Sequence, residues 1–174
     1  MLKKLSALSL VALCVIFSAN ASAQWFAHVE DDIFSDTGKK ATLISGGNTG
    51  SLVFDCENNK LHFAFVEESP LTFNDKYTGF SYPVKLIIKV DDNQPFSFDA
   101  VRKRRNQHTR EAGLVFEYSE KEDFLPVFEQ FESAKSKILV GIDSGRDSKY
   151  SRTIGATGST AATKRFLKSC GLRD

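Results

Sequence analysis

The sequence predicts a mainly β (α+β) fold: an antiparallel sheet or β-sandwich of about eight or nine short strands with two helices, the second of them C-terminal. Three observations lead to this prediction. Apolar residues alternate with polar ones along short runs, most clearly in residues 84–90 and 61–66. Turn-forming residues separate these runs at short intervals. The apolar period then becomes helical in residues 124–134 and again in residues 158–170.

The first half of the chain reads as strands joined by turns. The pair 51–56 and 61–66 is the clearest hairpin, because Leu52, Phe54 and Cys56 share one face and Leu61, Phe63 and Phe65 share another. The remaining polar, turn-rich stretch at residues 67–82 is expected to be a long loop. The strands predicted before that loop cover residues 25–30, 40–44, 51–56 and 61–66.

The second half adds further strands and both helices. Asp123 is a candidate cap for the first helix, and Pro126 is compatible only with a position near its start. Gly158 and Ser159 are expected to cap the closing helix, and Gly171 suits the left-handed residue that follows it. Residues 102–113 are charged and are expected to form a loop or hairpin tip. The predicted strands here cover residues 84–90, 96–100, 114–118, 137–142 and 150–156.

The N-terminus has the pattern of a secretory signal peptide. Lys3 and Lys4 precede an apolar run from Leu5 to Phe17, and Ala21-Ser-Ala23 supplies the small residues of a cleavage site. The run is shorter than the roughly 20 apolar residues of a membrane-spanning helix. We therefore expect residues 1–23 to be a leader cleaved near Ala23/Gln24, and residues 24–174 to form one exported domain, periplasmic or secreted, with no membrane span.

Cysteine usage agrees with export. Cys14 lies in the leader, which leaves Cys56 and Cys170 in the mature chain. Two cysteines in an oxidising compartment favour a disulfide, although two buried thiols are the alternative. The predicted disulfide would hold the C-terminal helix against an early strand.

The densest charge in the chain is a basic run. Arg102, Lys103, Arg104 and Arg105 are followed by Arg110, and this loop could bind the phosphate or carboxylate groups of an envelope polymer. A solvated surface is the simpler alternative. No aromatic residues alternate with the cations to stack on bases, and removal of Lys3 and Lys4 leaves the chain one acidic residue in excess, so a nucleic-acid partner is not expected.

Two short motifs resemble those of aspartic proteases. Asp36-Thr-Gly38 and Asp143-Ser-Gly145 could supply a pair of carboxylates that shares one proton. Against this, Asp36 lies in a polar stretch, and such tripeptides are also common turns. The three histidines lack metal-ligand spacing, and no phosphate-binding glycine loop occurs. No cofactor or metal is therefore expected, and no catalytic residue is assigned.

Both ends of the mature chain carry a resemblance to a known group. The residues are a Trp at the start, Leu52-Val-Phe-Asp-Cys56 after a Gly-rich turn, and the closing segment Gly158 to Cys170. This pattern resembles small periplasmic proteins of Gram-negative bacteria related to the type VI secretion accessory VasI/TagO and, more loosely, invasion-associated locus B proteins. The resemblance implies a β-rich exported domain with a C-terminal helix and no established catalytic activity. It leaves residues 67–113 unmatched, and Asp55 stands where a basic residue is expected.

The sequence thus favours an exported non-enzymatic domain that binds an unidentified envelope protein or polymer. Two alternatives remain. One is a small-molecule carrier with a cavity lined by some of the 15 phenylalanines. The other is a hydrolase that uses Asp36 and Asp143.

Overall fold

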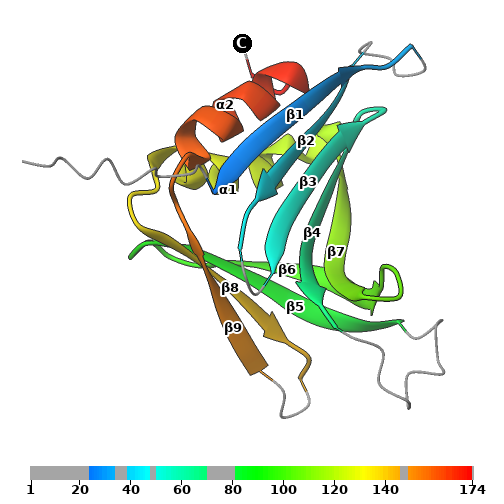
Figure 1. Cartoon of the computed structure of the whole chain (residues 1–174), viewed down its shortest axis with the longest axis vertical. Coiled ribbons are helices and arrows are strands. Elements are labelled where there is room, and N and C mark those ends of the chain that lie inside the picture. Colours follow the sequence, from blue (N-terminus) through cyan, green and yellow to red (C-terminus); the bar gives the residue numbers. More distant parts are fainter. Residues whose placement is uncertain (1–23, 34–38, 48–49, 70–80, 146–148, 174) are drawn as a thin grey trace, which may run out of the picture.

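A computed structural model describes residues 24–33, 39–47, 50–69, 81–145 and 149–173. Nine strands form one antiparallel sheet in the order β1-β2-β3-β4-β7-β6-β5-β8-β9, bent into a half-barrel (Figure 1). The fold class predicted from the sequence is confirmed, as a single sheet. The strands are β1 (Trp25–Asp31), β2 (Lys39–Ser45), β3 (Ser51–Glu57), β4 (Lys60–Glu68), β5 (Ser81–Val90), β6 (Phe96–Arg104), β7 (Thr109–Glu117), β8 (Lys137–Asp143) and β9 (Lys149–Gly155).

The two helices pack on the concave face of this sheet. A short 3₁₀ turn, η1 (Tyr118–Glu120), leads into α1 (Lys121–Ser133), and α2 (Ser159–Ser169) follows β9. Phe54 on β3 lies at the centre of the core, and its ring centroid is 4.9 Å from that of Phe128 on α1 and 6.4 Å from that of Phe166 on α2. Burial of these rings removes apolar surface from water and so stabilises the packing of both helices on the sheet.

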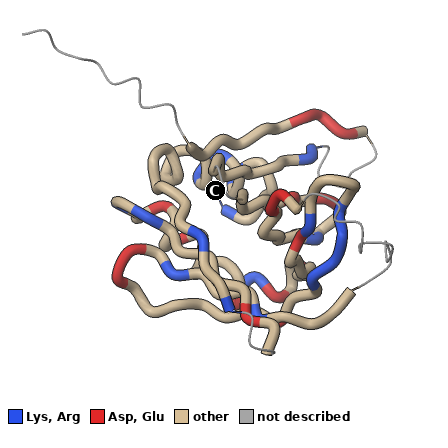
Figure 2. The backbone as a smooth tube through the Cα atoms, turned by 60° about the horizontal axis from the view of Figure 1, so that its bottom comes forward, with Lys and Arg blue, Asp and Glu red and all other residues tan. Residues whose placement is uncertain are grey.

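Residue alternation explains which side chains face the helices. In β3 and β4 every second residue is buried, and the register pairs Phe54 with Phe63 and Cys56 with Leu61. Opposite residues of an antiparallel pair point to the same side, so these rows extend across the sheet as one apolar face. Figure 2 shows the basic and acidic residues spread along the described backbone.

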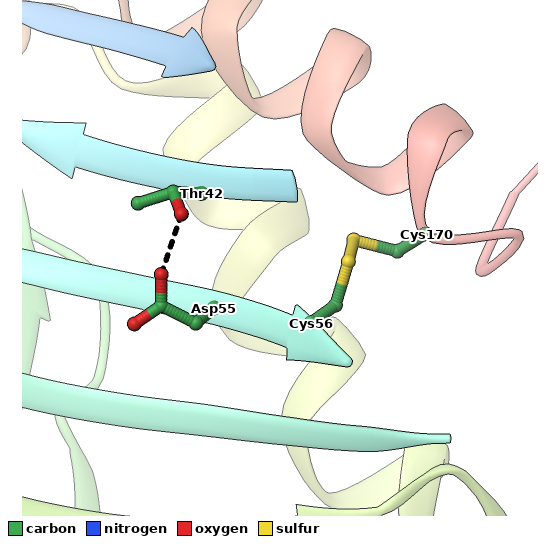
Figure 3. Close-up of a disulfide and its surroundings, with 4 residues drawn as sticks. All are labelled: Thr42, Asp55, Cys56 and Cys170. Atoms are coloured by element: carbon green, nitrogen blue, oxygen red, sulfur yellow. Dashed lines mark hydrogen bonds between the residues drawn. A yellow bond between two sulfur atoms is a disulfide. The ribbon is translucent and has the colours of Figure 1, made fainter. Parts of the chain in front are cut away.

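The disulfide joins the last helix to β3. Cys170 follows α2 and is bonded to Cys56, with the two Cα atoms 5.9 Å apart (Figure 3). Both cysteines are buried within the core. On the opposite side of β3, Asp55 accepts a hydrogen bond of 2.6 Å from Thr42 Oγ1 on β2. Asp55 therefore helps to hold β2 against β3. After α2, Gly171 has the left-handed φ of 65° that was expected there.

Four local predictions are corrected in part or in full. The expected loop at residues 67–82 gives its first two residues to β4 and its last two to β5, and residues 70–80 lie outside the described residues. The stretch 102–113, expected to be a loop or hairpin tip, consists of two strand segments and the tip that joins them, residues 105–108. Asp123 lies in the first turn of α1 after the true N-cap, Glu120. Gly158 is the N-cap of α2 as expected, but Ser159 is the first residue of the helix, and its hydroxyl donates to the Phe131 carbonyl oxygen at 2.7 Å and so fastens α2 to α1.

Candidate anion-binding site

The predicted basic loop is split between the two faces of the sheet. Because strand residues alternate, Arg102 and Arg104 on β6 point to the concave side with the buried Ala100, whereas Lys103 points to the convex side. Register places Arg110 of β7 opposite both Arg104 and Glu67, so it also belongs to the concave side. Of the five predicted residues, the structure brings Arg102, Arg104 and Arg110 together.

Lys103 and Arg105 take part in a separate group on the convex side. Their nitrogen atoms lie 3.2 and 3.3 Å from the carboxylate of Glu111 on β7. The Glu111 side chain is only 15% exposed, and it contacts both cations. Lys103 and Arg105 thus share one carboxylate on the convex side.

Glu67 is the buried anion of the concave cluster. It is only 9% exposed, and its Oε1 accepts hydrogen bonds from the Arg102 guanidinium and, at 2.7 Å, from the Tyr150 hydroxyl. The side chain of Arg102 is 12% exposed. A buried charge is costly unless paired, and here each ion satisfies the other. The three residues join β4, β6 and β9 across the concave side of the half-barrel.

Tyr150 is held as a neutral donor in this cluster. Burial, followed by the hydrogen bond to Glu67, raises the pKa of the phenol above its ordinary value. The ring also contacts two cations, because the Cζ atoms of Arg102 and Arg152 are 5.3 and 5.0 Å from its centroid. Guanidinium groups at this distance from an aromatic ring are attracted by its quadrupole. Tyr150 therefore positions both arginines without adding negative charge.

Arg152 is the arginine of this cluster that lacks an acidic partner among the described residues. Its Nη1 donates to the Ser151 carbonyl oxygen at 3.2 Å, and its Nε is buried with no hydrogen-bond acceptor in the described part of the chain. Register places it beside the buried Val140 of β8, on the face that carries Tyr150 and Ile154. A partly buried guanidinium with an unsatisfied donor is the kind of group that binds an anion.

No family model, curated protein or solved structure matches this chain. The resemblance to the VasI/TagO group therefore stays a prediction, as does the expectation that the protein is not an enzyme.

The distance between the two carboxylates proposed from the sequence, Asp36 and Asp143, is not defined, because Asp36 lies outside the described residues. Asp143 ends β8, where it accepts from Lys149 Nζ at 2.8 Å and from the Gly145 backbone N–H at 2.9 Å. These bonds, that with Lys149 first, lower the pKa of Asp143 below its ordinary value. A carboxylate in this environment is stabilised in its ionised form, as in a turn that closes a hairpin.

Other site types find no support in the described residues. None of them forms a group of three or more His, Cys, Asp or Glu side chains suited to a metal ion. His28 Nε2 lies 2.7 Å from Oε1 of Glu30 on the same strand, which is a surface ion pair and not a metal site. Among the helices described, none is both long and apolar enough to cross a membrane.

Three residues of the cluster were not predicted as site residues from the sequence: Glu67 lies in a predicted loop, and Tyr150 and Arg152 lie in a predicted strand. For two of them the sequence does contain a signal. Alternation from Ile154 backwards puts Arg152 and Tyr150 on the inner face of β9. A charged residue at an inward position of a strand is unusual enough to mark a candidate site.

Proposed function

We propose that this protein is an exported, non-enzymatic binding domain whose concave face binds an anionic group of an envelope component. The signal-peptide pattern and the buried disulfide support the exported setting. The binding role is supported by the concave cluster, in which Arg102 is paired with the buried Glu67 whereas Arg152 has no acidic partner among the described residues. An unpaired cation fits an anionic ligand rather than a neutral or cationic one.

One observation carries the proposal: Arg152 is partly buried and has no acidic partner in the described chain, although Arg102 beside the same ring has one. A protein gains nothing in stability from a desolvated cation that remains unpaired. Its retention is accounted for if an external anion completes the pair. The Tyr150 ring and Glu67 hold the neighbouring Arg102 in place, so the site is ordered before the ligand arrives.

The test is a titration of the protein purified from the periplasm after expression with its own leader. Isothermal titration calorimetry with phosphate, sulfate, acetate and citrate measures whether the chain binds anions. We expect at least one of these anions to bind the wild type, and Arg152→Gln to weaken its binding at least about tenfold, which corresponds to about 1.4 kcal/mol.

Lys149→Gln is the matched control. It removes one positive charge from the same strand, but Lys149 is on the opposite face and pairs with Asp143. Its affinity for the anion should stay within about twofold of the wild type, since exposed pairs contribute little. The proposal is wrong if none of the four anions binds, or if Arg152→Gln binds as tightly as Lys149→Gln.

A further inference from the structure

The concave cluster contains an acceptor that no described residue uses. Both hydrogen bonds to the Glu67 carboxylate end on Oε1, from Arg102 and from Tyr150. Its second oxygen, Oε2, accepts no hydrogen bond from any described residue, although Glu67 is only 9% exposed. Glu67 accepts from the Tyr150 hydroxyl at 2.7 Å, and Arg152 Cζ lies 5.0 Å from the centroid of the same ring. An ionised carboxylate offers about four lone-pair sites, so a ligand beside Tyr150 has a guanidinium group and an unused acceptor on neighbouring residues.

We infer that the anion bound here is one that carries its own proton: a phosphate or phosphate monoester, in preference to a fully ionised anion such as sulfate. This rests on the proposed function, and it narrows the class of ligand. The phosphoryl oxygens face the guanidinium groups, and the P–OH group donates to Glu67 Oε2. Such O–H···O⁻ bonds are short, about 2.5–2.7 Å, and about twice as strong as neutral ones.

Sulfate cannot make the hydrogen bond to Glu67 Oε2. Its four oxygens carry no proton near neutral pH, so any sulfate oxygen near Glu67 would place two acceptors and two negative charges in contact. A polar group that must stay unpaired in a desolvated site costs about 1–3 kcal/mol. A site built around an acceptor therefore rejects the ligand that lacks the donor, even when size and shape are the same.

Among the described residues, the charged and titratable groups of the concave side near Glu67 are Arg110 from β7, Arg102 and Arg104 from β6, Tyr82 from β5, and Tyr150 and Arg152 from β9. The raised pKa of Tyr150 keeps its proton in place. A phosphate monoester loses its second proton, and with it its P–OH group, near pH 6. Binding of a monoester should therefore weaken as the pH rises from 6 to 8, whereas inorganic phosphate keeps one P–OH group as its dianion and should bind across this range.

The experiment compares inorganic phosphate with sulfate at pH 6.0 by calorimetry, using the wild type, Glu67→Gln and Glu68→Gln. Glu68 is the next residue of β4, is exposed and points to the other face, so it is the matched control. We expect the wild type and Glu68→Gln to bind phosphate at least about tenfold more tightly than sulfate. In Glu67→Gln the amide can donate to sulfate, so the ratio should fall below about threefold.

The outcomes separate this inference from the proposed function. If no anion binds, both are wrong. If phosphate and sulfate bind the wild type equally well, the preference for a protonated anion is wrong while anion binding stands. The wild-type ratio needs no variant, so it decides the matter even if Glu67→Gln does not fold.

Two further titrations decide whether the phosphate group belongs to a soluble ester or to a lipid headgroup. Glycerol 3-phosphate tests a soluble ester, and vesicles of phosphatidylcholine with phosphatidic acid test the same group on a lipid surface. Binding to the soluble ester with an affinity like that of phosphate would support a small or polymer-borne ester. Binding to the vesicles alone would support a lipid headgroup, and Arg152→Gln should weaken whichever binding is seen at least about tenfold.

Discussion

At the scale of single residues, Asp91 shows how one side chain can fix the geometry of two loops. It follows β5 with a left-handed φ of 47°. Its carboxylate accepts from the Ser136 hydroxyl at 2.6 Å and from the backbone N–H groups of Lys135, Ser136 and Lys137 at 2.8–3.0 Å. The turn after β5 is thereby joined to the connection between α1 and β8.

These bonds make the contribution of Asp91 depend on pH. The Ser136 hydroxyl, followed by the backbone donors, lowers the pKa of Asp91 below its ordinary value of 3.8. A carboxyl group whose pKa is lower in the folded state stabilises the protein above its unfolded pKa, and this stabilisation is lost as the pH falls through the folded pKa. The dependence therefore belongs to the acid range below about pH 4.

We expect Asp91→Asn to lower the Tm at pH 7, because an amide replaces a charged acceptor with a weaker one. The difference in Tm between wild type and variant should shrink as the pH falls from 4 towards 2, since the unfolded wild-type chain takes up a proton on this carboxyl group there while the folded state still holds it ionised. Thermal unfolding followed by circular dichroism measures both effects. Asp92→Asn, at the exposed neighbouring position, is the control and should leave the Tm unchanged. Equal Tm values for the two variants would contradict this role.

At the scale of elements, α2 depends on its attachments. It has 11 residues, and isolated helices shorter than about 12–15 residues are marginal in water. Phe166 and Leu167 are fully buried against the sheet, and Cys170 binds it covalently to β3. Its helical state is therefore a product of packing and of the disulfide more than of local preference.

Removal of the disulfide should cost about 4–5 kcal/mol, because the bond closes a loop with a sequence separation of 114. The variant Cys56→Ala/Cys170→Ala should lose this amount in urea unfolding. Reduction of the wild type should reproduce most of the loss without any change of sequence. A loss below about 1 kcal/mol in both experiments would show that α2 is held by packing alone.

The strands and helices could be predicted where local pattern and tertiary environment agree. Alternation predicted the β3–β4 hairpin, and the change of period predicted both helices. The pattern failed at Arg102 because charge on a strand normally indicates solvent. Here its partner Glu67 lies 35 residues away in the sequence, and Tyr150 lies 83 residues from Glu67. No local pattern contains such long-range pairs. The sequence therefore predicted Arg102, Arg104 and Arg110 as site residues, but it could not predict Glu67, Tyr150 and Arg152.

The Phe-lined cavity expected for a carrier was also inferred from a local pattern alone. Alternating phenylalanines indicate an inward face, but they do not say whether a ligand or another ring fills the space. In the structure Phe54 stacks on Phe63 at 4.5 Å, and both are at most 1% exposed. These rings serve as partners for one another, as in an ordinary core.

At the scale of the whole molecule, the two outer strands of the sheet are brought together. The Gln24 N–H donates to the Thr157 carbonyl oxygen at 3.0 Å, and the Trp25 indole Nε1 donates to the Gly155 carbonyl oxygen at 2.8 Å. Trp25 is also 2% exposed and packs on Phe131 of α1 at 5.0 Å. These contacts join the start of β1 to the end of β9 and so help to hold the half-barrel in its bent form.

We expect Trp25→Phe to destabilise the protein by about 1–3 kcal/mol, because Phe retains an aromatic ring but leaves the Gly155 carbonyl without its donor. Urea unfolding measures the loss, and hydrogen exchange should show faster exchange in β9 than in β3. Phe26→Leu is the control on the next residue, which is 50% exposed, and its effect should stay within about 0.5 kcal/mol. Equal losses in the two variants would contradict a role for the indole N–H.

The position of the disulfide also sets when oxidation can occur during folding. Cys170 follows α2, and Cys56 lies in β3, with a sequence separation of 114. The two sulfur atoms can meet in their native positions only after α2 has docked on the sheet. The bond therefore records that docking has succeeded, and a chain whose last helix is undocked would keep two reactive sulfhydryl groups.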